Sequence, residues 1–351
     1  MTRASEEPLP HAKPLVLQRF DILKLFTVDT KEQNFSCQFL LEFILPEGTD
    51  PSTDKDFPVD TRAGEDFKLS ARWYLDKIEP QNLSGDGPAK LLDSSCFPKD
   101  GQTILQMRFK GTFFVELDLK DFPVDKQELT IKMIYLCQTT NIARDGLLRA
   151  KFELGPERSC VLSKLGLMSP KKTWLPLDDR KLTCKPCEHV AGDRTFPALT
   201  ATLRVRRKQL GYYNYNVALP SGLLSGLSLV TFSYPPNNYS SRVSTSLSLM
   251  IATSAYLQVV AAKVPQTNTM TKLDKYIIAN FIMLAAVVLV GGTMHHAIDN
   301  DDDTTIDSDG WPRPAADWVL FAVLSSAWAC IQLSYFGWLH WSTYAAAQQR
   351  A

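Results

Sequence analysis

The stretch Arg242-Val-Ser-Thr-Ser-Leu-Ser-Leu-Met-Ile-Ala-Thr-Ser-Ala-Tyr-Leu-Gln-Val-Val-Ala-Ala-Lys263 decides how the rest of the chain is interpreted. Between its two basic ends lie about twenty uncharged residues, enough for a helix to cross a bilayer. The segment carries more hydroxyl and amide groups than a helix surrounded by lipid would carry. These groups belong to Ser244, Thr245, Ser246, Ser248, Thr253, Ser254 and Gln258. The composition predicts a membrane helix that is not surrounded by lipid.

At helical spacing, this segment has one stripe of residues separated by steps of three and four. The stripe consists of Ser244, Ser248, Ile251, Ala255, Val259 and Ala262, and we include Ser241 and Gln258 with it as pore-lining candidates. In a symmetric ring of subunits the stripe would line a narrow pore with an apolar constriction at Ile251, and such a constriction can close by dewetting. The alternative is a helix rich in small residues that packs inside a membrane bundle.

The composition divides the chain into two parts. Residues 1 to about 208 hold most of the charged side chains, whereas residues 209 to 344 are mostly apolar. Four uncharged apolar segments are each near the length that spans a bilayer, at about 212–234, 243–262, 276–294 and 318–341. We therefore expect a tail at residues 1–13, which we take to be flexible, a domain at 14–208 and a transmembrane domain at 209–351. The formal net charge is zero, so no nucleic-acid partner is indicated.

The first part shows many short runs of alternating apolar and polar residues with turn signals between them. Asp100-Gly101 is a hairpin signal between two such runs. The runs lie at about 15–28, 35–45, 103–119, 129–136, 180–190 and 200–207. This pattern predicts an all-β sandwich of about ten strands, so the fold class is an N-terminal β-sandwich followed by a four-helix transmembrane bundle.

The connection between the last two helices, residues 295–317, is rich in aspartate. Asp307-Ser-Asp309-Gly310 resembles part of a calcium loop, but Thr305 and Ala316 stand where acidic ligands should be, which favours a solvated acidic linker. The positive-inside rule would place this linker outside the cell. That orientation is opposite to the one that the family resemblance below implies.

The seven cysteines and five histidines give no recognisable metal or catalytic spacing. Cys184-Lys-Pro-Cys187 lacks the second pair of ligands that a zinc site needs, which leaves a local disulfide or two thiols. The adjacent His295-His296 is an interfacial pair or a proton sensor. We expect no catalytic residue, no metal site and no cofactor.

Residues 1–13 have no apolar signal-peptide core, so an extracellular first part needs internal signals or a segment missing from this sequence.

Several motifs resemble those of the pentameric ligand-gated ion channels, the superfamily of the Cys-loop receptors. Phe122-Pro-Val-Asp-Lys-Gln127 is similar to the signature Phe-Pro-Phe-Asp-x-Gln loop. The other matching positions are Asp100-Gly101, Arg108-Phe109, Asp118, Tyr212-Tyr213, Asn216, Pro220, Arg242-Val243 and Pro265. The resemblance covers roughly residues 15 to 341. Val115 and Leu129 stand where animal receptors carry the loop cysteines, so the resemblance points to the Cys-less, prokaryotic-type branch.

The resemblance implies a homopentamer in the cell membrane that is gated by a small-molecule agonist or by protons, conducts inorganic ions and contacts membrane lipid. Its N-terminal domain would be extracellular or periplasmic. The implied coupling residues are Asp29, Lys31, Glu32, Phe122, Pro123, Asp125, Arg206, Arg207, Lys208 and Pro265. The basic cluster among them has an alternative role as a lipid headgroup anchor.

The resemblance also implies an agonist pocket near residues 80–82, 135–137 and 187–197. Its candidate residues are Gln38, Trp73, Gln81, Tyr135, Cys137, His189 and Phe196. The central positions of the cation-binding aromatic cage fall near Gln38, Pro80 and Leu136, which are not aromatic, so a quaternary ammonium agonist is disfavoured. The alternative is that Tyr135 and Phe196, one residue away from expected positions, substitute for them. Ser240-Ser241 matches neither the cation nor the anion pattern at the inner mouth, and the acidic linker gives a slight preference for cations.

The rival hypothesis is a non-conducting receptor or adhesion protein whose sandwich is merely anchored by the helices. It would not require a polar stripe interrupted by one bulky residue. An enzyme is disfavoured because no catalytic constellation is recognisable.

Overall fold

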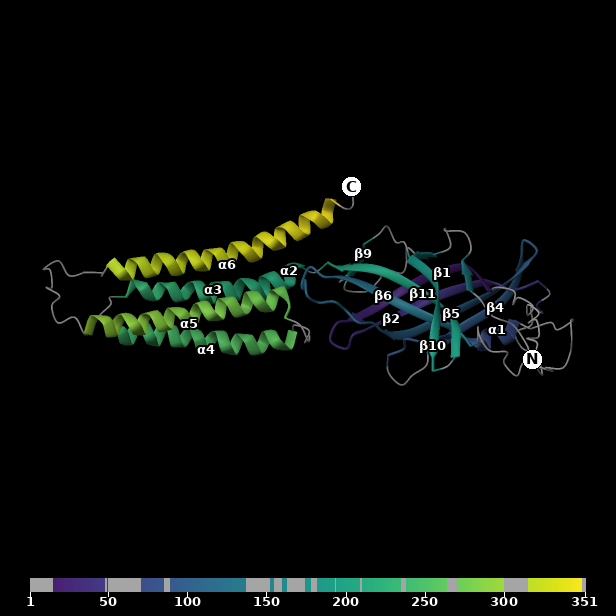
Figure 1. Ribbon diagram of the computed structural model, residues 1–351, viewed down its shortest axis with the longest axis horizontal. Helices are drawn as coiled ribbons and strands as arrows, with labels where there is room; N and C mark the ends of the chain where they lie inside the picture. Colours follow the sequence, from purple (N-terminus) through teal and green to yellow (C-terminus); the bar gives the residue numbers. More distant parts are fainter. Residues whose placement is uncertain are drawn as a thin grey trace, which may run out of the picture. The chain divides into compact units, whose positions relative to one another are not determined.

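The computed structural model describes residues 15–47, 49, 71–84, 89–136, 152–154, 160–162, 174–177, 182–192, 194–208, 210–234, 238–263, 270–299 and 315–348. The chain divides into two compact units (Figure 1). The first comprises Met1–Leu117 and Lys126–Lys208, and the second comprises Asp118–Asp125 and Gln209–Ala351. The short segment Asp118–Asp125 therefore belongs to the helical unit, although its sequence neighbours belong to the β unit.

The first unit is a β-sandwich of two sheets, which confirms the predicted fold. One sheet has the order β4-β5-β2-β1-β7 with β8 paired to β1, and the other has the order β10-β11-β6-β3 with β9 paired to β11. The strands are β1 Leu15–Asp29, β2 Asn34–Ile44, β3 Ile78–Pro80, β4 Lys90–Lys99, β5 Gln102–Phe114, β6 Lys126–Tyr135, β7 Phe152–Leu154, β8 Cys160–Leu162, β9 Trp174–Pro176, β10 Leu182–Ala191 and β11 Arg194–Arg207.

Alternation along β2 builds the centre of the sandwich core. Its inward residues are all buried: Phe35, Cys37, Phe39, Leu41 and Phe43. Phe39 stacks on Phe20 of β1 with ring centroids 5.3 Å apart. Burying one such side chain contributes about 1.5–3 kcal/mol, so this face fixes the register of β1 and β2.

Six elements of the first unit lie outside the predicted runs: α1, β3, β4, β7, β8 and β9. Helix α1, Ala71–Lys77, precedes β3, and β4 lies at the edge of its sheet. The hairpin expected at Asp100-Gly101 is confirmed, since it joins β4 to β5 with φ angles of 52° and 77°. Positive φ at both positions is the geometry that an Asp-Gly pair favours.

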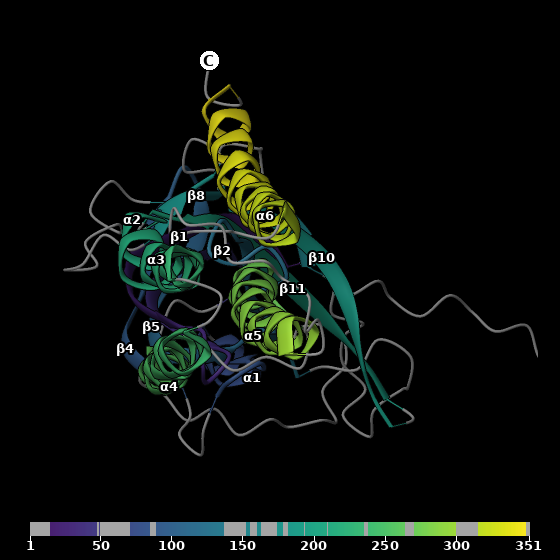
Figure 2. The ribbon, with the colours of Figure 1, turned by 90° about the vertical axis from the view of Figure 1, so that its left-hand side faces the viewer.

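The second unit contains four helical segments that are long and apolar enough to cross a membrane. The first is continuous but irregular, and the others are regular α-helices that run alongside one another (Figures 1 and 2). The bounds are α2 Leu210–Tyr213, η2 Asn214–Ala218, α3 Leu219–Ser228, η3 Leu229–Ser233, α4 Tyr239–Lys263, α5 Lys272–Asp299 and α6 Ala315–Gln348. The helix α5 extends beyond its expected end at residue 294, because a helix can continue into polar sequence after its apolar segment ends.

A π-helical turn, η2, precedes Pro220 in the first membrane segment. Proline has no N–H group, so the carbonyl of Asn216, four residues earlier, loses its helical donor. The Tyr256 hydroxyl of α4 donates to this carbonyl and also to that of Val217, at 3.3 Å. A neighbouring helix therefore satisfies the carbonyl that Pro220 leaves without its helical donor.

Polar side chains and glycines hold α3, α5 and α6 together. Ser225 donates to Asn280 Oδ1 at 2.5 Å and accepts from Trp328 Nε1 at 3.1 Å. Asn280 Oδ1 also accepts from Gln332 Nε2 at 3.0 Å. Interhelical hydrogen bonds of this kind contribute to association where both helices are apolar.

Candidate functional site

Helix α4 has two distinct faces in the single chain. Its buried face carries Arg242, Ser246, Thr253 and Val260, which point into the bundle. Its exposed face carries Ser240, Ser244, Leu247, Ser248, Ile251, Ala252, Ser254, Ala255, Gln258, Val259 and Ala261. A helix that packs into the bundle on one side and exposes hydroxyl-bearing residues on the other can border an aqueous path.

The predicted pore stripe lies on the exposed face of α4. Ser244, Ser248, Ala255, Gln258 and Val259 are all exposed, and Ser241 is half-exposed. Ile251 is the most exposed large apolar residue of this helix, at 71%. The side chain of Ala262 lies outside the described residues. The stripe and its single bulky side chain therefore share one accessible surface.

The hydroxyl groups on this face donate to the backbone of their own helix. Ser248 Oγ donates to the carbonyl of Ser244 at 2.8 Å, and Ser254 Oγ donates to that of Met250 at 2.9 Å. A hydroxyl whose proton is used in this way has only its acceptor lone pairs left for solvent. At Ser248 and Ser254 the exposed face consequently presents oxygen acceptors rather than donors.

The loop Asp118–Asp125 contacts the end of α2 and the start of α5. Phe122 is buried and packs edge-on against Tyr213, with ring centroids 4.6 Å apart. The carboxylate of Asp121 pairs with Lys272 Nζ at 2.9 Å. The Lys272 N–H donates to the carbonyl of Lys120 at 3.1 Å. These contacts join the signature loop to two helices of the bundle.

Lys272 also reaches the outer helix α6. Its ammonium group lies 4.3 Å from the centroid of the Trp338 ring, within the range of a cation–π interaction. Lys272 therefore links the loop, the start of α5 and α6. Asp121, Lys272 and Trp338 were not among the predicted coupling residues. Two of them had a signal in the sequence, since Lys272 lies in the connection 263–275 before the predicted third helix and Asp121 directly precedes Phe122.

The other predicted coupling residues lie in several environments. Asp29 accepts from the backbone N–H groups of Lys31 and Glu32 at 2.8 and 3.2 Å, which closes the β1–β2 turn. Asp125 is buried. The guanidinium of Arg207 lies over the Trp174 ring at 4.5 Å. Arg206 of β11 lies opposite Lys126 of β6, and Lys208 directly follows β11. Pro123 lies in the loop Asp118–Asp125, and Pro265 is outside the described residues.

The described agonist-pocket candidates lie on both sheets of the sandwich, with His189, Phe196, Tyr135 and Gln81 on or next to the adjacent strands β10, β11, β6 and β3. Tyr135 is buried and stacks near Tyr74, with centroids 6.4 Å apart. His189 and Phe196 face each other across the β10–β11 hairpin. Gln38 lies on β2 and Gln81 follows β3, whereas Cys137 and the side chain of Trp73 lie outside the description. The agonist site remains a prediction.

The pair Cys184 and Cys187 does not form a disulfide. Both lie on β10, and a separation of three residues directs their side chains to opposite faces of the strand. Cys184 is buried and Cys187 is exposed. Among the described residues, no group of three or more His, Cys, Asp and Glu side chains could hold a metal ion.

Comparison with known proteins finds similarity to acetylcholine receptor subunits. The epsilon subunit of Rattus norvegicus is 32% identical over 90 residues, which are 25% of this chain and 18% of that subunit. The neuronal beta-2 subunit of Gallus gallus is 24% identical over 218 residues, 62% of this chain and 40% of that subunit. The neuronal alpha-4 subunit of Mustela putorius furo is 24% identical over 296 residues, 81% of this chain and 43% of that subunit.

The chain thus spans less than half the length of each of these relatives. No family model matches the chain. The relatives are receptor subunits rather than enzymes. Together with the four membrane-spanning helices, they make this chain a multi-pass membrane protein.

Proposed function

We propose that this chain is a subunit of a homopentameric ligand-gated ion channel whose pore is lined by α4. The observation that carries the proposal is the exposed stripe on α4, which combines hydroxyl-bearing residues with the single large side chain of Ile251. In a lipid environment, exposed serines are unfavourable, whereas around a shared axis they would line water. The similarity to receptor subunits supports the same conclusion.

In this proposal Ile251 forms the gate. Five isoleucine side chains at one level would make an apolar ring, from which water is expelled when the helices approach. Exposed residues outside the stripe, such as Leu247, would contact neighbouring subunits instead. The outward oxygen acceptors of Ser248 and Ser254 favour cations over anions on this surface.

The coupling path runs through the loop Asp118–Asp125. Agonist or proton binding in the sandwich shifts a closed–open equilibrium by its differential affinity for the two states. The contacts of Asp121 and Phe122 with Lys272 and Tyr213 provide a route from that loop to the first and third membrane segments. Asp29, Asp125 and the basic run Arg206, Arg207 and Lys208 are the further coupling residues of the proposal.

The names of the relatives specify acetylcholine as their ligand. For this chain we propose an agonist of different chemistry, because the expected cage positions near Gln38, Pro80 and Leu136 carry no aromatic side chain. A cation–π cage requires aromatic faces around the ammonium group.

Recording from the purified full-length chain in planar bilayers tests the function. Steps of pH and a panel of small amines, small acids and divalent ions are applied to wild type, Ile251→Ser and the control Leu247→Ser. We expect Ile251→Ser to conduct without agonist, because a hydrated constriction cannot dewet, while Leu247→Ser behaves like wild type. If neither wild type nor Ile251→Ser conducts under any condition, the channel function is wrong and a non-conducting receptor is favoured.

A further inference from the structure

Arg242, at the start of α4, points away from the exposed stripe and into the bundle. Its guanidinium forms a two-pronged ion pair with Asp317 of α6, through Nη1–Oδ1 at 3.0 Å and Nη2–Oδ2 at 2.8 Å. The two side chains are 5% and 2% exposed in the single chain. A buried arginine with this geometry is held in one position.

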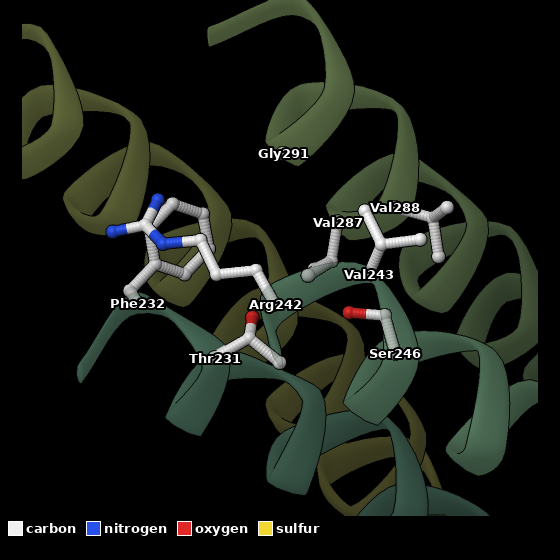
Figure 3. A pocket seen from close by; sticks show the side chains of 8 residues that line it. All are labelled: Thr231, Phe232, Arg242, Val243, Ser246, Val287, Val288 and Gly291. Atoms are coloured by element: carbon white, nitrogen blue, oxygen red, sulfur yellow. The ribbon is translucent and has the colours of Figure 1, made fainter. Parts of the chain in front are cut away.

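Two further contacts complete the surroundings of the guanidinium. Nε and Nη2 donate to the carbonyl of Tyr234, at 3.1 and 2.6 Å. The guanidinium carbon lies 5.7 Å from the centroid of Phe232, and Figure 3 shows the side chain reaching toward that ring. The end of η3, the start of α4 and the start of α6 are therefore joined at one charged group.

The position of Arg242 in the sequence would allow another arrangement. It adjoins Ser241 and lies two residues before Ser244, both of which belong to the proposed pore stripe. Five unpaired guanidinium groups at that level would form a ring of positive charge, which is the feature that selects anions in pores. In the structure the charge is instead withdrawn from the exposed face and balanced by a carboxylate.

Among the described residues that line the cavities beside this ion pair, Asp317 is the only carboxylate. The cavity beside Arg242 has a volume of about 10 Å³, and its lining includes Val243, Val287 and Val288 (Figure 3). Such a space holds about one water molecule, and its lining also includes the hydroxyl-bearing Thr231 and Ser246. A second cavity, of about 220 Å³, adjoins Asp317 and is otherwise lined by Phe232, Ser233, Trp318 and Phe321. An unpaired cation among these mostly apolar side chains is unfavourable, and the long side chain would turn toward water.

We propose that Asp317 is a specificity-determining residue, which keeps the Arg242 charge out of the pore entrance and so preserves cation permeation. This inference rests on the proposed channel function. Asp317 acts through Arg242 and does not itself contact the permeating ion, so it is a positioning residue. Its location in the first turn of α6 is favourable for a carboxylate, because the helix dipole is positive there.

The test uses the Ile251→Ser parent, which the proposed gate makes conduct without agonist. Sodium-to-chloride permeability ratios are obtained from reversal potentials in a salt gradient for Asp317→Asn, Arg242→Gln and the double variant. Asp274→Asn is the control, because it also removes a carboxylate from the first turn of a membrane helix. Gel filtration of each purified variant checks that it assembles like the parent.

We expect Asp317→Asn to lower the permeability ratio about tenfold, as a ring of like charge changes local ion concentrations by this order. The double variant should return to the parent ratio because the freed charge is gone. Arg242→Gln alone and Asp274→Asn should keep the parent ratio. If Asp317→Asn does not assemble, the permeability ratio of Arg242→Gln tests the inference instead. A higher sodium-to-chloride ratio in Arg242→Gln than in the parent would mean that the wild-type arginine already faces the pore.

An unchanged ratio in a conducting Asp317→Asn channel overturns the inference and leaves the channel function standing. A double variant that keeps the ratio of Asp317→Asn also overturns it, because the shift would then come from altered helix packing. No current from either wild type or the Ile251→Ser parent overturns the channel function itself, and the inference falls with it.

Discussion

Single residues at the loop–helix contact make several weak interactions at once. Lys272 pairs with Asp121, lies over Trp338 and bonds through its backbone to Lys120. An exposed ion pair and an exposed cation–π contact each contribute about 0.5–1 kcal/mol. These energies are too small to decide whether the chain folds, but they are large enough to change how tightly the loop Asp118–Asp125 is held.

Replacing Lys272 with Gln should loosen that loop without unfolding the protein. Losing about 1 kcal/mol corresponds to an approximately fivefold faster local opening. Hydrogen–deuterium exchange of peptides covering residues 118–125 measures this change. Lys275→Gln is the matched control, because Lys275 is exposed and lies three residues further along α5. Equal exchange in the two variants would contradict a role for Lys272 in holding the loop.

The cysteines of the β-sandwich should differ sharply in reactivity. Burial raises the pKa of the Cys37 thiol, whereas Cys187 is exposed on β10. Because the folded-state pKa of Cys37 lies above its unfolded value, its contribution to stability is complete below the unfolded pKa and declines as the pH rises past it. At neutral pH the Cys37 thiol remains neutral and enclosed.

We expect a maleimide reagent to label Cys187 rapidly in the native protein and Cys37 only after unfolding. Peptide mass spectrometry locates the label. Cys187→Ser should remove the rapid label at this position, and Cys37→Ser should leave it unchanged. Native labelling of Cys37 at the rate of Cys187 would show that the β2 core opens readily.

Among the elements, α3 allows unusually close approach by its neighbours. A Cβ atom at Gly222 would lie 2.5 Å from the Tyr276 hydroxyl and 2.7 Å from Gln332 Oε1. At Gly226 it would lie 3.0 Å from the Trp328 ring. These two glycines, four residues apart, form a small-residue face of the type that brings membrane helices together. The hydrogen bond from Tyr276 to Gln332, at 2.6 Å, depends on that proximity.

Gly222→Ala should destabilise the bundle by about 1–3 kcal/mol, since the added methyl group forces neighbouring side chains apart. Thermal unfolding in detergent, followed by Trp fluorescence, measures the effect. Gly337→Ala is the control, because a Cβ atom there meets nothing within 4 Å. This variant should be neutral or slightly stabilising, as alanine is the better helix former. A Gly222→Ala protein that melts like Gly337→Ala would mean that α3 and α5 pack less closely.

For the whole molecule, the proposed function requires an assembly with an axis beside the exposed face of α4. Native mass spectrometry of detergent-solubilised protein should give five times the 39.4 kDa chain mass. Cross-linking of Leu247→Cys should capture neighbouring subunits, because that residue is exposed beside the stripe. A species with the mass of one chain under all detergents would exclude the shared pore.

Much of this organisation could be predicted from local patterns. The alternation in β1 and β2 reflects burial, because successive side chains of a strand point to opposite faces. The four uncharged segments reflect a membrane environment instead, since they are long and apolar enough to cross a bilayer although most of their residues are not buried in the single chain. By contrast, β4 is an edge strand with mostly exposed side chains, so it has no such alternation. Its hairpin turn was the only signal that marked its end.

The contacts that organise the candidate site could not be predicted in the same way. Arg242 and Asp317 are 75 residues apart, and no periodicity relates them. Asp317 is also the last residue of the predicted acidic linker, where one more aspartate carries no information. The sequence marks which residues are charged, but tertiary packing decides which opposite charges become buried together.

Helix α6 is 34 residues long, which at 1.5 Å per residue is about 51 Å, while the hydrocarbon core of a bilayer is about 30 Å thick. A helix of this length must tilt to keep its apolar segment within the core. It is attached to α4 through Asp317 at one end and to α5 through Trp338 near the other. A change of membrane thickness therefore alters the inclination of α6, and these two attachments transmit that inclination to both ends of the bundle.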